Sequence, residues 1–344
     1  MGFDADYSGA QLVLVHGNED FMSAGGSTKV VFIALGVNFG IACVKGVAAL
    51  LTGSAAMLAE TVHSFVDCGN QILLLVGMKR ATAPATKEHP LGYHRELYFW
   101  TMVVAGALFV GGGVASLYEG WEKVMHPAEM QPVHLLGHVF PGWWMNVIIL
   151  AISGSMEGYG FFAAVKSLPR SEGVSLWRMI RRSADPGLFV VLFEDGAALV
   201  SLVVALLFTV LSVVTGLHVL DGIASLLIGV VLVVVAGLLT NETRSLLVGE
   251  SNPEIDAFVR AEAQKLPGVV GINEVVTETR GPDSIIVLLS LDWDDAMSAG
   301  DVERGVSMLE KTTRARYPAV LRMYIEAQDK RDGIPAALNS SGLL

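Results

Sequence analysis

The residues best suited to chemistry are His63 and Asp67, which lie four positions apart in a long apolar stretch. Residues four apart share one face of a helix, so the imidazole and the carboxylate point the same way. An ionisable side chain in the core of a bilayer costs about 2.5–3.5 kcal/mol on insertion scales, so two on one face need a reason beyond packing. Because both groups are transition-metal ligands, we predict half of a divalent-cation site here.

A second apolar stretch carries the adjacent carboxylates Glu194 and Asp195. Buried carboxylates are rarely left without a partner, so we expect them to face His63 and Asp67 across a helix bundle. Adjacent helical positions diverge by about 100°, so one of the two is the better ligand and the other supports it or carries a proton. Nitrogen and oxygen ligands without a thiolate suit zinc, and also manganese, cobalt or ferrous iron.

These residues define the predicted site. The metal ligands are His63, Asp67, Asp195 and Glu194, and the candidates for proton coupling are His63, Glu194 and Glu60. We expect no cofactor, since the divalent cation itself is the ligand of this site. The alternative, that His63 and Asp67 are an acid–base pair of a membrane enzyme, would need a nucleophile or substrate pocket, and the apolar stretches offer no convincing candidate.

Composition indicates that membrane-crossing helices position these residues. Only 17% of the 344 residues are charged, against about 25% in a globular protein, and the mean hydropathy is +0.54. A span needs about 20 apolar residues. We expect an all-α bundle with six spans, near residues 29–51, 54–78, 97–118, 143–165, 187–210 and 219–240 of a transmembrane domain covering 29–245.

The basic residues of the loops predict the orientation, because cytoplasmic loops carry the excess of Lys and Arg. The loop between the fourth and fifth predicted spans is the richest, and the loop between the second and third follows it; the residues are Lys166, Arg170, Arg178, Arg181, Arg182, Lys79, Arg80, Lys87 and Arg95. Both termini are then cytoplasmic, with residues 1–28 as a cytoplasmic tail. Since no organelle signal is visible, a bacterial inner (plasma) membrane is the default location.

After the sixth span the sequence becomes that of a soluble α+β domain, residues 250–330, followed by a loose tail at 331–344. Its pattern predicts the order α-β-β-α-β, with Gly281-Pro282-Asp283 as a turn between the first two strands. The three aspartates Asp292, Asp294 and Asp295 are interpreted as a solvated loop. Because no histidine follows His218 and neither cysteine lies in this domain, we expect no tight zinc site there.

Several blocks of the chain resemble the cation diffusion facilitator transporters. They are residues 59–67, His89-Pro90-Leu91-Gly92-Tyr93-His94-Arg95-Glu96, residues 119–127 and residues 247–250, in the family's order. The resemblance covers about residues 29–330. It implies metal–proton antiport by alternating access, homodimers formed through the C-terminal domain, and a ferredoxin-like fold for that domain.

The fifth span departs from the family's zinc pattern. The zinc-transporting members of the resembled family usually carry H-x-x-x-D in this span. Here Val191 occupies the histidine position, and Glu194 precedes Asp195. This pattern looks like the branch typified by the mitochondrial zinc exporter. We therefore expect zinc efflux first, with a manganese, cobalt or iron exporter as the alternative, because losing an imidazole makes the site harder.

The resemblance also leaves a second class of function open, a metal-responsive membrane scaffold or sensor that does not transport. The expected partners are the divalent cation, protons, membrane lipid and a second copy of the chain. The net charge of the chain is −11, and we expect no nucleic acid among its partners.

Overall fold

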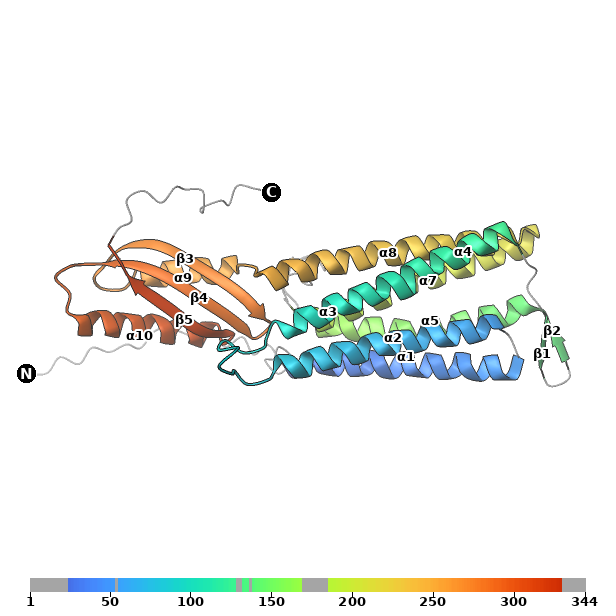
Figure 1. Ribbon diagram of the computed structural model, residues 1–344, viewed down its shortest axis with the longest axis horizontal. Coiled ribbons are helices and arrows are strands. Elements are labelled where there is room, and N and C mark those ends of the chain that lie inside the picture. Colours follow the sequence, from blue (N-terminus) through green and yellow to red (C-terminus); the bar gives the residue numbers. More distant parts are fainter. Residues whose placement is uncertain (1–23, 53–54, 128–131, 136–137, 169–184, 330–344) are drawn as a thin grey trace, which may run out of the picture.

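The long apolar stretches form helices that lie side by side along the molecule, and a smaller domain containing a sheet continues from one end of them (Figure 1). The computed structural model describes residues 24–52, 55–127, 132–135, 138–168 and 185–329. The helices of the bundle are α1 (Ala24–Thr52), α2 (Ala55–Ala81), α3 (Glu96–Ala107), α4 (Ala115–Met125), α5 (Gly142–Ser167), α7 (Pro186–Thr215) and α8 (Val219–Val248).

Five helical segments of the described chain are long and apolar enough to cross a membrane: 28–47, 96–125, 142–167, 186–215 and 219–248. The second predicted span is not among them, although α2 has 27 residues and packs against α1 and α3. Its Asp67, Asn70 and Gln71 lower the hydropathy of this helix. The polar residues of the candidate site therefore also lower the hydropathy by which α2 would be identified as a membrane span.

Some predicted features lie outside the described residues. They are most of the N-terminal tail, Gly53 of the turn between the first two spans, the tail at 331–344, and the loop residues Arg170, Arg178, Arg181 and Arg182. The first helix begins at Ala24, inside the stretch predicted as tail.

The helix that carries Glu194 and Asp195 has well-defined ends. The side chain of Asp185 accepts the N–H of Gly187 at 3.0 Å, and Pro186 occupies the first turn, a pairing of residues that favours a helix start. At the other end Gly216 has a φ of 70°, the left-handed conformation that glycine adopts without strain. Between these ends α7 has 30 residues. It begins one residue before the predicted start at 187 and ends five residues after the predicted end at 210.

Close glycine contacts join α4 to α8. A Cβ added to Gly222 would lie 2.7 Å from the backbone nitrogen of Val124, and one added to Gly229 would lie 2.8 Å from that of Leu117. The run Gly111-Gly112-Gly113 also packs closely, since a Cβ on the last of them would lie 2.7 Å from a Val233 side-chain carbon of α8. These three glycines lie in a π-helical segment, η2 (Leu108–Val114), which joins α3 to α4.

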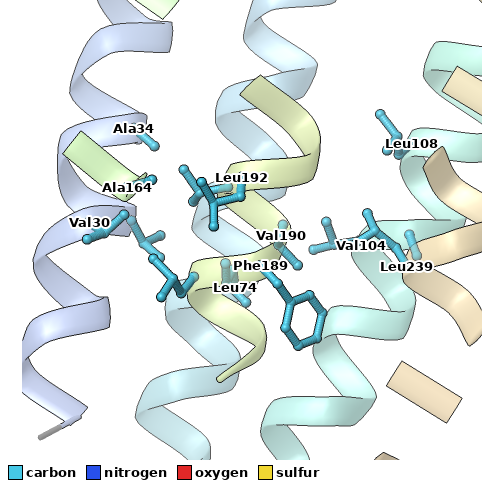
Figure 2. Close-up of a cluster of buried hydrophobic side chains, with 14 of the residues drawn as sticks. Val30, Ala34, Leu74, Val104, Leu108, Ala164, Phe189, Val190, Leu192 and Leu239 are labelled. Carbon is cyan, nitrogen blue, oxygen red and sulfur yellow. The ribbon is translucent and has the colours of Figure 1, made fainter. Parts of the chain in front are cut away.

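An apolar core fills the part of the bundle nearest the C-terminal domain. Several helices contribute side chains to this core, as Figure 2 shows: Val30 of α1, Leu74 of α2, Val104 of α3, Ala164 of α5 and Leu239 of α8. The beginning of α7, Leu188–Leu192, lies among them and is buried throughout. Glu194 and Asp195 follow after Phe193, so the carboxylates lie next to this buried apolar run.

The C-terminal domain has the predicted order α-β-β-α-β. Its elements are α9 (Pro253–Ala263), β3 (Val269–Gly281), β4 (Ser284–Trp293), α10 (Ala299–Arg316) and β5 (Val320–Ala327). The sheet has the order β3-β4-β5, antiparallel across the hairpin and parallel between β4 and β5, because α10 crosses over between them. The predicted α+β domain is thus confirmed. A two-stranded hairpin, β1 (Val133–Leu135) with β2 (His138–Phe140), was not expected from the sequence.

The loop before α3 contacts this domain. Arg95 donates a hydrogen bond and forms an ion pair with Glu278 of β3, and His94 lies against Gly281 at the turn of the hairpin. Burial, and then the positive charge of Arg280, hold the pKa of His94 below its ordinary value, while Asp283 acts in the opposite direction. The motif residues His94 and Arg95 therefore link the bundle to the C-terminal domain.

Candidate metal site

The fold brings carboxylates of the second and fifth predicted spans near one another. Asp67 of α2 is half-buried, while Glu194 and Asp195 of α7 are only 8% and 5% exposed. The Asp67 carboxylate is close enough to interact electrostatically with both of the others. Like charges gathered in an apolar bundle repel unless a cation or protons compensate them, so these carboxylates can attract a divalent cation.

Glu194 is held by two amides that the sequence reading did not identify. Asn70 Nδ2 donates to Glu194 Oε1 and Gln71 Nε2 donates to Oε2, each at 3.1 Å. The amides come three and four residues after Asp67, on the same face of α2. The sequence could have indicated these partners, because Asn70 and Gln71 are amide residues one helical turn after Asp67 in a largely apolar helix.

A glycine on α5 leaves space for the Asp195 carboxylate. A Cβ added to Gly160 would lie 2.9 Å from Asp195 Oδ2, closer than real Cβ atoms approach an oxygen. The glycine therefore leaves the space that the carboxylate occupies. This contact was also absent from the sequence reading, because nothing in the sequence shows which face of α5 meets α7.

Val191 lies one helical turn before Asp195, where the resembled family's zinc pattern has histidine. Its side chain is 1% exposed and belongs to the apolar core. The gap left by the missing imidazole is thus filled by packing.

His63 and Glu60 belong to α2 by their backbone, but their side chains lie outside what the structure describes. Among the described residues, no group of three or more His, Cys, Asp or Glu side chains is arranged to hold a metal ion. The predicted set of His63, Asp67, Asp195 and Glu194 therefore remains a prediction.

In the C-terminal domain, Asp292 lies at the end of β4, where it pairs with Gly271 of β3, and Asp294 and Asp295 follow the strand. Asp294 accepts the N–H of Ala296 at 2.9 Å through its side chain, and its own N–H donates to the Gly268 carbonyl. Asp294 and Asp295 are exposed. This is the hydrogen bonding of a turn at the surface, in line with the interpretation as a solvated loop.

Comparison with known proteins gives a consistent family. The chain is 30% identical over 274 residues to the mitochondrial proton-coupled zinc antiporter SLC30A9 of Homo sapiens. The aligned residues make up 78% of this chain and 46% of that relative. It is 27% identical over 275 residues to metal tolerance protein C4 of Arabidopsis thaliana, covering 79% and 58%. It is 25% identical over 268 residues to the cation-efflux pump FieF of Pectobacterium atrosepticum, covering 78% and 81%.

The chain spans about half the length of the SLC30A9 relatives that it matches. The family model for the cation efflux transmembrane domain matches residues 31–248, which include the whole of the bundle from α2 to α8. With this match and these apolar helices, the chain is an integral membrane protein and belongs to the cation efflux (cation diffusion facilitator) family.

Proposed function

We propose that this chain exports a divalent transition-metal cation, most readily zinc, in exchange for protons. The observation that carries the proposal is the electrostatic interaction of Asp67 on α2 with Glu194 and Asp195 on α7, inside the bundle of a cation efflux protein. The names of the SLC30A9 relatives describe proton-coupled zinc antiporters, and those of the FieF relatives describe cation-efflux pumps.

In the proposed mechanism His63, Asp67 and Asp195 coordinate the cation, and Glu194 is either the fourth ligand or a proton carrier. Ligands must be deprotonated to coordinate, so cation binding displaces protons. Protons from the opposite side later return to the same groups, with Glu60 as a further candidate, and expel the cation. The same residues thus bind the cation and couple it to protons, and no covalent chemistry is required.

The apolar core supports the alternating-access part of this mechanism. It includes Leu97 at the start of α3 and Leu246 at the end of α8, the helix ends next to the C-terminal domain (Figure 1). On α7 it includes Leu188–Leu192 (Figure 2), which come just before the carboxylates in the chain. A hydrated cation cannot cross a packed apolar layer without a large cost. We therefore propose that α2 and α7 separate from their neighbours at this core when the site opens to the cytoplasm.

The proposed orientation has both termini in the cytoplasm of a bacterium, with the C-terminal domain forming a homodimer. On the sheet face away from α9 and α10, Val276, Leu288 and Tyr324 form a row across the three strands and are 39%, 42% and 47% exposed. A second copy would cover this row. Leu288→Glu should lower the molar mass measured by light scattering in detergent, and an unchanged dimer would refute this interface.

Flux measured in proteoliposomes that carry a pH gradient tests the function. Zinc, manganese, cobalt, ferrous iron and cadmium are supplied in turn, and metal uptake is followed together with internal pH. We expect zinc to drive proton movement most strongly. The absence of net flux for all five metals would contradict transport and favour the scaffold or sensor.

The choice of metal is tested in the same assay with Val191→His. The new imidazole, one turn before Asp195, should raise the preference for zinc over manganese. Val190→His is the matched control, because both valines are 1% exposed but adjacent positions face different directions. Equal metal preferences in the two variants would show that position 191 does not face the cation.

A further inference from the structure

Both oxygens of the Glu194 carboxylate are bound by amides from the neighbouring helix. Asn70 and Gln71 each donate across the α2–α7 contact at 3.1 Å, and the three side chains are 3%, 1% and 8% exposed. An ionised carboxylate only accepts hydrogen bonds, so each amide must turn its NH2 group toward it. The carboxylate is therefore held at two points, one for each oxygen.

We propose that Asn70 and Gln71 are positioning residues of the cation site, which hold the Glu194 carboxylate in place on the side of α7 that faces Asp67. This inference rests on the proposed transport function and adds two residues to it that are not themselves ionisable. A glutamate has three rotatable bonds, and repulsion from Asp67 would otherwise turn it away.

The hydrogen bonds leave Glu194 able to bind a cation. Each carboxylate oxygen has two lone pairs, and one amide N–H uses only one of them. Carboxylates that bind metals are commonly held by hydrogen bonds of this kind, and loss of such a partner reduces metal affinity or activity by about 10- to 100-fold.

A second observation concerns the oxygen of the Gln71 amide. Its amide oxygen is buried and has no hydrogen-bond partner in the described part of the chain. Buried polar atoms nearly always have a partner, so this oxygen has one more contact to make. With its nitrogen committed to Glu194 Oε2, that oxygen lies within the same cluster of polar groups.

The test is zinc binding, measured by titration calorimetry on the full-length protein in detergent. Asn70→Leu and Gln71→Leu replace the donors with apolar side chains, and each should weaken zinc binding by about 10- to 100-fold. Thr101→Val is the matched control: it removes a fully buried hydrogen bond to the Leu97 carbonyl on α3, and it should leave zinc binding unchanged.

A double-mutant cycle separates positioning from general damage to the fold. In a Glu194→Ala background the amides have nothing to hold, so adding Asn70→Leu should change zinc affinity by less than about twofold. If Gln71→Leu does not fold, Gln71→Asn takes its place, since it shortens the amide by one methylene and should give the same loss.

Unchanged zinc affinity in both amide variants would overturn the inference, and so would an equal loss with and without Glu194. Failure of the proposed function is distinguishable, because the wild-type protein would then neither bind zinc in the titration nor move any metal in proteoliposomes.

Discussion

Gly160 of α5 and Asp195 of α7 meet so closely that the glycine has no room for a side chain: a Cβ would lie 2.9 Å from Asp195 Oδ2. Gly160→Ala should therefore displace the carboxylate and weaken zinc binding by about 10-fold or more, as for loss of a group that orients a ligand. The measurement is zinc affinity by calorimetry.

Gly158→Ala is the matched control for this prediction. A Cβ on Gly158, two residues earlier in α5, would have nothing within 4 Å. It should bind zinc like the wild type. If Gly160→Ala bound zinc equally well, Asp195 could not be a ligand held in the observed position.

The glycine contacts between α4 and α8 predict a stability effect far from the cation. A Cβ on Gly229 would lie 2.8 Å from the Leu117 backbone nitrogen, and a backbone atom cannot move aside as a flexible side chain does. Gly229→Ala should lower the free energy of unfolding by about 1–3 kcal/mol, the usual cost of overpacking. Thermal unfolding in detergent measures it.

Gly237→Ala, in the same helix, provides the comparison. Nothing lies within 4 Å of its added Cβ, so the better helix propensity of alanine should leave the melting temperature unchanged or raise it. Equal melting temperatures for the two variants would contradict close packing of α4 on α8.

His94 predicts how the junction between the bundle and the C-terminal domain responds to pH. Its pKa is lowered by burial and then by Arg280, with Asp283 opposing, so the folded protein binds fewer protons here than the unfolded chain. The contribution to stability is therefore full above the ordinary pKa of about 6.5 and is lost as the pH falls through the lowered value.

His94→Gln should accordingly lose less stability than the wild type when the pH is reduced from about 7.5 to about 5. Arg280→Gln should give an intermediate result, because removing the neighbouring positive charge lets the pKa of His94 rise toward its ordinary value. Melting temperatures across this range check both variants. The same pH dependence in all three proteins would show that His94 does not titrate in this window.

The sequence predicts those parts of the structure that depend on local patterns. Asp185-Pro186 and Asn252-Pro253 mark helix starts because caps act within a few residues, and both side chains accept the expected backbone N–H groups. The α-β-β-α-β order follows from alternation and turn residues for the same reason. Asp67, Glu194 and Asp195 stand out because ionisable groups in apolar helices are few.

The remaining features depend on how helices pack, which no local pattern contains. Asn70 and Gln71 reach Glu194 across 124 and 123 positions of sequence, and Arg95 pairs with Glu278 across 183. The space at Gly160 exists only because α5 lies on α7. The zinc pattern of the resembled family pointed to Val191 as a gap in the site, and the structure shows that the gap is filled by apolar packing.

The central claim is that the carboxylates between α2 and α7 carry the cation. The most direct measurement is zinc-driven proton movement in proteoliposomes containing Asp67→Ala or Asp195→Ala, with wild-type protein assayed alongside and dimers verified by light scattering. We predict that each substitution abolishes coupled movement of zinc and protons while the protein stays dimeric. Unimpaired transport in both variants would contradict the account.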